Sequence, residues 1–153
     1  MSRNRIVAGL IFAALLVPLA LNAQNAGALA KARSIKCTFP LMAVGTWGAT
    51  RPEAKIQPAK HELEFVGINT DEGTAELKNP YGKFDIIVRY AEGYLHFVQS
   101  FLNGPLHTTT VLEKKTASGK LKAMHSRHEF TDFALPGFTS NPEQYYGECE
   151  VVE

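Results

Sequence analysis

One hydrophobic alternation constrains the fold of this chain more than any other feature. From Glu62 to Phe130, apolar residues recur at every second position in six short segments, and turn-forming residues separate these segments. A period of two residues is typical of strands that bury one face. If the chain reverses at each turn, the apolar face stays on the same side throughout. The pattern therefore predicts an antiparallel meander around one core.

Two flanking segments extend the meander to about eight strands. The strands are expected at residues 35–43, 61–69, 74–78, 83–90, 93–102, 106–114, 119–130 and 145–152. The strongest turn signals are Asn79-Pro80-Tyr81-Gly82 and Asn103-Gly104. Pro40 indicates an edge or a bulge, and residues 48–60, with Pro52 and Pro58, are expected to form a long exposed loop. The predicted fold is all-β: an up-and-down meander that makes a closed or nearly closed small β-barrel, with a two-sheet β-sandwich as the alternative.

Centring each turn gives a cross-strand register, and that register places a polar patch inside the barrel. The expected pairs are Val88 with Leu95, Gln99 with Thr108, Thr110 with His125 and Thr108 with Arg127. Burying an arginine without partners is costly. We therefore expect Arg127 either to be bonded to backbone carbonyls as a structural residue or to hold a carboxylate or phosphate of a ligand. The candidate ligand-binding residues are Arg127, His125, Gln99, Thr108 and Thr110, with Tyr90, Phe97 and Phe101 as the apolar lining.

The N-terminus has the features of an export signal. Arg3 and Arg5 precede an apolar run over residues 6–21, and small residues follow. This pattern is typical of a secretory signal peptide, whereas a membrane span needs about 20 apolar residues. We predict a signal peptide over residues 1–23, with cleavage possible as late as residue 28. A flexible tether or short helix over 24–34 and a single domain over 35–153 would follow.

The two cysteines and the charge balance agree with a protein outside the cytoplasm. Cys37 and Cys149 are the only cysteines, and an even pair in an exported chain predicts a disulfide. Two of the 16 basic residues, Arg3 and Arg5, lie in the signal, so the mature chain would carry 14 basic and 15 acidic residues, a net charge of −1. The remaining basic residues are scattered, which argues against nucleic acid as a partner.

No pattern in the sequence indicates catalysis or a metal. Ser126 lies between His125 and Arg127, but neighbours on a strand point to opposite faces, so no Ser–His dyad forms locally. His107 and His128 are expected to face one another on the outer surface, where two imidazoles without a third ligand make a weak site. We predict no enzyme activity, no cofactor and no metal.

Two resemblances add to these expectations. Gly45-Thr46-Trp47 resembles the Gly-x-Trp of lipocalins and avidins, in which a late-strand arginine or lysine packs on the tryptophan. That resemblance implies a calycin-like barrel in which Arg127 takes this place. Four further segments, residues 35–39, 109–111, 124–128 and 144–149, are similar to a group of small exported proteobacterial proteins. This second likeness implies an envelope location and groups His125, Arg127, Tyr145 and Tyr146 into one cluster.

The expected function is that of a periplasmic or secreted β-barrel that binds a small or amphipathic ligand in its interior. The alternative is a structural or protein-interaction module of the cell envelope. No stable membrane anchor is expected after cleavage of the signal.

Overall fold

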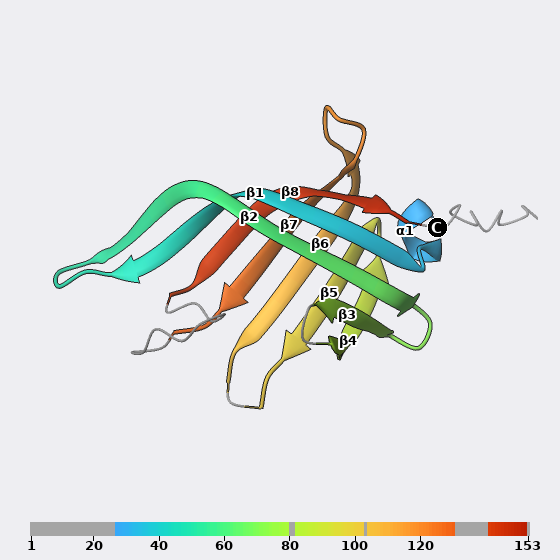
Figure 1. Ribbon diagram of the computed structural model, residues 1–153, viewed down its shortest axis with the longest axis horizontal. Helices are drawn as coiled ribbons and strands as arrows, with labels where there is room; N and C mark the ends of the chain where they lie inside the picture. Colours follow the sequence, from blue (N-terminus) through green and yellow to red (C-terminus); the bar gives the residue numbers. More distant parts are fainter. Residues whose placement is uncertain (1–26, 80–81, 103, 131–140, 153) are drawn as a thin grey trace, which may run out of the picture.

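The described part of the chain is a single sheet that closes on itself. The computed structural model describes residues 27–79, 82–102, 104–130 and 141–152. Its strands are β1 (Ser34–Trp47), β2 (Pro52–Asn69), β3 (Thr74–Asn79), β4 (Gly82–Ala91), β5 (Tyr94–Ser100), β6 (Leu106–Lys115), β7 (Leu121–His128) and β8 (Glu143–Val151). Each strand pairs antiparallel with the next, and β8 pairs with β1, so the order β1 to β8 forms a closed barrel (Figure 1). This confirms the all-β meander and decides between the barrel and the sandwich.

The core fills the barrel with alternate residues from every strand, as the two-residue period predicts. Phe65 on β2 and Phe97 on β5 stack face to face, with ring centroids 3.8 Å apart, although their strands are not neighbours in the sheet. Val88, Leu95 and Val111 are fully buried around them. Each fully buried aliphatic side chain stabilises the fold by roughly 1.5–3 kcal/mol.

A short helix closes the end of the barrel at which β1 begins. Helix α1 (Ala28–Lys31) places Leu29 in the core, where it is fully buried. The hydroxyl of Thr70 donates to the carbonyl of Ala30, and the guanidinium of Arg33 donates to the carbonyl of Ile68. Residues 28–34 are thus a packed helix and a strand entry, which agrees with the short helix that was the alternative to a tether there. Residues 24–26 lie outside the described residues. We call the other end of the barrel the distal end.

A two-stranded arm extends from the distal end (Figure 1). Residues 48–60 were expected to form a loop, but β2 already begins at Pro52, and its first half pairs with the second half of β1. The remaining neighbour, β3, pairs only with Glu64–Asn69 of β2. A proline lacks the N–H that a second neighbour would need, so Pro52 and Pro58 are tolerated on this free edge. We call residues 45–60 the arm. The bulge predicted at Pro40 is confirmed, because the register shifts between Phe39 and Leu41.

The register of β6 differs from the prediction by one residue, which turns this strand over. Gln99 pairs with His107, whereas the predicted partner was Thr108. The β5–β6 turn is one residue longer than the Asn-Gly hairpin assumed, since the N–H of Phe101 donates to the carbonyl of Pro105. The predicted pair of Val88 with Leu95 is also wrong, since Val88 pairs with Phe97. That error spans two residues and leaves the inward face unchanged.

A second irregularity restores the orientation of β7. The β6–β7 register shifts between Val111 and Lys115, and His125 pairs with Thr109 rather than with Thr110. His125 therefore still faces inward, and Arg127 follows on the same face. Only the residues of β6 have exchanged faces.

The predicted disulfide is present at the closing seam of the barrel. Cys37 on β1 and Cys149 on β8 are paired residues in the β1–β8 ladder, and both are fully buried.

In the described part of the chain, no helix has the length and apolar character to cross a membrane. The predicted signal peptide, residues 1–23, lies outside the described residues.

Candidate functional site

The distal half of the barrel interior holds a cluster of polar side chains. We call it the distal cluster, and its members are His61, His107, His125, Arg127, Glu129, Glu143 and Tyr145. The strands explain this grouping, because residues at every second position of β7 project to one face, and so do those at the start of β8. In the ladder, Arg127 pairs with both His107 and Glu143, and His125 pairs with Tyr145.

An aromatic group forms the floor of the cluster. The ring centroid of His61 lies 5.0 Å from that of His125 and 4.6 Å from that of Tyr145. The ring of Phe39, which is almost fully buried, lies 5.8 Å from His61 and 5.9 Å from His125. The imidazoles therefore lie against apolar rings, where a charged form is poorly solvated.

Two hydrogen bonds fix the histidines of β6 and β7. The hydroxyl of Thr109 and Nδ1 of His125 are 2.8 Å apart in a buried pair. Nε2 of His107 bonds to Oε1 of Glu129, whose side chain is only 1% exposed. The ring of Phe101 packs edge-on against His107 at 4.8 Å. Each imidazole is thus held by one polar partner within apolar surroundings.

Among the described residues, the arginine of the cluster has one long ion pair and one contact with an aromatic ring. Nη1 of Arg127 lies 3.9 Å from Oε2 of Glu143, and its guanidinium lies 5.7 Å from the centre of the Tyr145 ring. The same Glu143 oxygen accepts a hydrogen bond from the hydroxyl of Tyr145. A distance of 3.9 Å is too long for a direct hydrogen bond. Among the described residues, the Nε of the guanidinium has no hydrogen-bond partner.

Burial keeps the imidazoles neutral. It lowers the pKa of His125 from 6.5 to about 2 and that of His61 to about 4, with repulsion from Arg127 adding to both shifts. The pKa of His107 is also lowered, because burial outweighs the opposing hydrogen bond and charge of Glu129. Burial and the hydrogen bond to Glu143 raise the pKa of Tyr145. The three imidazoles and the phenol are therefore uncharged at neutral pH.

Four buried polar atoms of the cluster have no hydrogen-bond partner among the described residues. They are Nε2 of His61, Nε2 of His125, Nε of Arg127 and Oε2 of Glu129. Most buried polar groups in proteins are paired, and each unpaired one costs about 1–3 kcal/mol. The guanidinium N–H can only donate and the carboxylate oxygen accepts, so the set offers both kinds of bond. Four such atoms in one cluster mark a place where a polar molecule would be stabilised.

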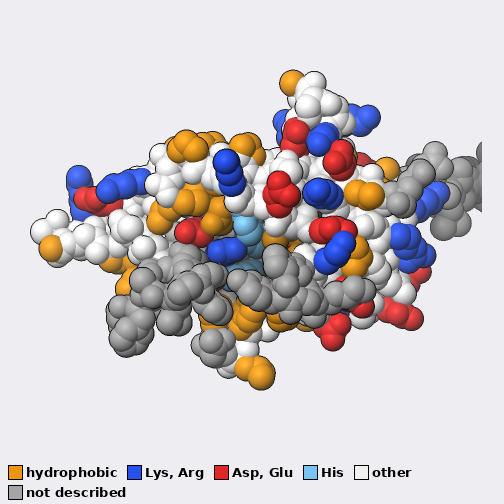
Figure 2. Space-filling view, in the orientation of Figure 1, with side chains coloured by type: hydrophobic (Ala, Val, Ile, Leu, Met, Phe, Trp, Pro, Cys, Tyr) orange, Lys and Arg blue, Asp and Glu red, His pale blue; other side chains and the backbone are white. Residues whose placement is uncertain are grey.

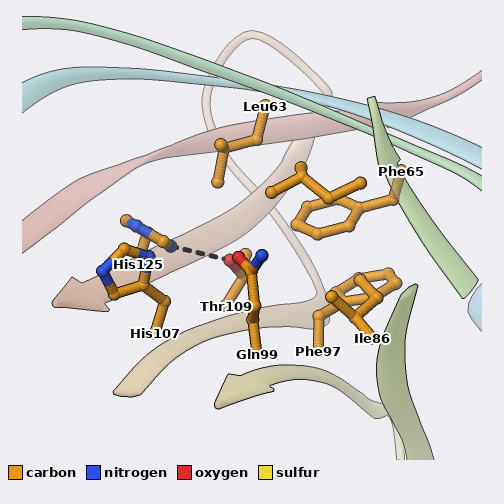
Figure 3. A pocket seen from close by; sticks show the side chains of 9 residues that line it. Leu63, Phe65, Ile86, Phe97, Gln99, His107, Thr109 and His125 are labelled. Carbon is orange, nitrogen blue, oxygen red and sulfur yellow. Dashed lines mark hydrogen bonds between the residues drawn. The ribbon is translucent and has the colours of Figure 1, made fainter. Parts of the chain in front are cut away.

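A small cavity adjoins the cluster. Its volume is about 10 Å³, which is roughly the space that one water needs. Gln99, His107, Thr109 and His125 line its polar side, and Phe65, Ile86 and Phe97 line its apolar side (Figure 3). Leu63 and Leu77 complete the lining. The cavity therefore connects the polar cluster to the apolar core.

The cluster is partly accessible from outside. The side chains of Arg127 and His107 are 21% and 16% exposed, whereas that of Glu129 is closed off. Histidine side chains are visible in a hollow of the surface, beside basic and acidic side chains (Figure 2). A molecule can therefore reach Arg127 and His107 before it reaches the deeper atoms.

The structure brings together some of the predicted site residues and separates others. His125, Arg127, Gln99, Phe97 and Phe101 all lie in or beside the distal cluster and its cavity. Thr108 and Thr110 do not, because the one-residue slip places them on the outer face, where Thr110 bonds to His96. Tyr90 lies near the α1 end and donates to Glu113.

Sequence reasoning missed several members of the cluster. His107 was placed outside by the wrong register, and His61 was not assigned a partner. Glu129 follows Arg127 by two residues on the inward parity, so the alternation itself could have found it. Of the two tyrosines grouped with His125 by resemblance, Tyr145 is in the cluster, whereas Tyr146 is 43% exposed.

The expected packing of Arg127 on Trp47 is not formed. Trp47 lies in the arm, is 63% exposed and contacts Phe130, with ring centroids 5.7 Å apart. Arg127 lies over Tyr145 instead. The packing of a late-strand arginine or lysine on the tryptophan, which the resemblance to lipocalins implies, is therefore absent among the described residues.

The histidines do not pair as predicted on the outer surface. His107 faces inward and is paired with Arg127, while His128 is paired with Leu106 and is exposed. Among the residues that the structure describes, no three or more histidine, cysteine or acidic side chains are arranged to hold a metal ion.

Comparisons of the chain with models of protein families, with curated proteins and with solved structures gave no match.

Proposed function

We propose that this protein is an exported β-barrel that binds a small molecule at the distal cluster. The observation that carries the proposal is the set of four buried polar atoms without partners, on His61, His125, Arg127 and Glu129. A ligand that bonds to them would recover the free energy that their burial costs. Export is supported by the charged and apolar N-terminus and by the disulfide.

The surroundings favour a ligand with a polar but uncharged group. Glu143 lies beside Arg127 and Glu129 beside His107, and the two carboxylates oppose a second anion in the cluster. An amide, an alcohol or a protonated acid can donate to Glu129 and accept from Arg127. This refines the expectation of a carboxylate or phosphate. An apolar part of the ligand would lie toward Phe65 and Phe97.

The ligand would be bound rather than converted. A general base works best with a pKa near the operating pH. The pKa of His125 is about 2 and that of His61 about 4, so neither accepts a proton readily at neutral pH. We therefore propose a carrier or sensor rather than an enzyme.

A second candidate is a structural or interaction module of the envelope. The observation that favours it is the size of the cavity, about 10 Å³, because only a water would fit without movement of the wall. The two candidates differ in whether the four unpaired atoms are matched by a ligand or by water alone.

Native mass spectrometry of protein isolated from the cell envelope separates these candidates. The variant is Arg127→Ala, and the matched control is Arg89→Ala, which removes an exposed arginine from β4. A ligand held by the guanidinium should be lost or bound about 10- to 100-fold more weakly in Arg127→Ala. It should be retained in the control. Wild-type protein that carries no additional mass, and that binds no component of an envelope extract, would contradict the binding proposal.

A further inference from the structure

Exposed apolar side chains gather at the distal end. Among the described residues, the four most exposed large apolar side chains are Leu102 at 110%, Ile56 at 74%, Trp47 at 63% and Phe130 at 60%. Trp47 and Ile56 belong to the arm, Leu102 to the β5–β6 turn, and Phe130 follows β7. In an up-and-down barrel these connections all lie at the end opposite α1 (Figure 1).

The position of these side chains is more informative than their exposure. Single exposed apolar residues are ordinary on protein surfaces. Here they occupy three separate connections at one end, and two of them touch, since Trp47 and Phe130 pack edge to face. Apolar groups that protrude together from one end are typical of an interaction surface.

The charge of the arm indicates the partner. The arm contains three basic residues, Arg51, Lys55 and Lys60, and one acidic residue, Glu53. Figure 2 shows basic side chains along one edge of the arm, with an acidic side chain beside them. Tryptophan with flanking lysine and arginine is the combination that favours the interface of a bilayer. Each basic residue near an anionic lipid surface strengthens binding about fivefold.

We propose that the distal end docks on an anionic lipid bilayer, with Trp47 and Ile56 inserted among the headgroups and the basic residues of the arm against lipid phosphates. The docking surface lies outside the distal cluster, so this inference is independent of the ligand proposed above.

The arm contains its own reporter. Trp47 is the only tryptophan in the chain, so fluorescence of the full, disulfide-bonded mature protein reports on this surface alone. On addition of vesicles of phosphatidylglycerol and phosphatidylcholine, the emission should shift to shorter wavelength. Lipids with bromine-labelled acyl chains should quench it. Pure phosphatidylcholine vesicles and high salt should weaken both effects.

Matched variants locate the surface. Ile56→Ser should weaken vesicle binding about tenfold, from the apolar area no longer buried, and Lys55→Gln about fivefold. Ile87→Ser is the control, because Ile87 is 54% exposed on the wall of the barrel, opposite Thr74 and therefore toward the α1 end. Circular dichroism of each variant checks the fold.

Three outcomes would overturn the inference. One is an emission spectrum of the folded protein that vesicles leave unchanged. Another is vesicle binding that Ile87→Ser weakens and Ile56→Ser does not. The third is a blue shift that depends on protein concentration without vesicles, accompanied by a doubled mass in sedimentation, because the surface would then join two copies of the chain. Loss of ligand in Arg127→Ala with normal vesicle binding would leave this inference intact.

Discussion

Reducing the disulfide should cost this barrel a large part of its stability. Cys37 and Cys149 are separated by 112 residues and join the first strand to the last. In the chain-entropy treatment, a loop of this length restricts the unfolded chain by about 5 kcal/mol. Small domains have total stabilities of about 5–15 kcal/mol. We therefore expect the reduced protein to be marginally stable, with a midpoint of thermal unfolding lower by roughly 20 °C.

Urea unfolding with and without reductant measures this difference. Mass spectrometry after alkylation confirms that the thiols are free in the reduced sample. The unfolded oxidised chain is more compact, so its denaturant dependence should also be shallower than that of the reduced chain. A difference in the free energy of unfolding below about 1 kcal/mol would refute the reasoning. It would show that the β1–β8 ladder alone closes the barrel.

Two further predictions concern the distal cluster. Because the pKa of His125 is about 2 when folded and near 6.5 when unfolded, the unfolded chain binds the proton more readily. The contribution of neutral His125 to the free energy of unfolding should be fully present above pH 6.5. On acidification below that pH, it should fall by up to about 1.4 kcal/mol per pH unit. Urea unfolding between pH 7 and 4 tests this, and His125→Gln should flatten the dependence. Thr109→Val should cost about 1–3 kcal/mol by removing the buried partner of His125. Thr108→Val, on the outer face, should be nearly neutral, and equal effects of the two would contradict the register.

The general architecture could be predicted because the alternation is long and each strand has one buried face. Ile86, Val88, Leu95 and Phe97 all face inward as the parity requires. The β4–β5 pairing was displaced by two residues, yet this left the inward face unchanged. The number of strands, the disulfide and the bulge at Pro40 followed from local signals alone.

The orientation of β6 could not be predicted, because both of its faces carry similar residues. Thr108, Thr110 and Leu112 alternate with His107, Thr109 and Val111, so hydrophobicity does not choose between the two faces. The choice depends on whether the β5–β6 turn contains two residues or three. The Asn-Gly pair favours two, whereas the structure has three, with Gly104 at a φ of 112°.

Only part of the site was predicted, because the orientation of β6 was ambiguous. Arg127 and His125 lie on a strand whose parity is clear, whereas His107 lies on the ambiguous one. The arm was missed because Pro52 and Pro58 count as signals against a strand in the sequence alone. A proline disfavours a strand only where both edges of that strand are paired. That β2 has one free edge here depends on where β3 ends, which is a property of the whole sheet.

The topology of the sheet also orders events during folding. Every ladder except β1–β8 joins strands that follow one another in sequence, so each closes a much shorter loop than β1–β8 does. Contacts between segments distant in sequence form late and slowly. Until β8 is in place, β1 and β7 each present an open edge that another chain can pair with. Pairing of the last strand therefore covers both open edges and ends the risk that another chain pairs with them. A chain interrupted before Glu143 would keep both edges open.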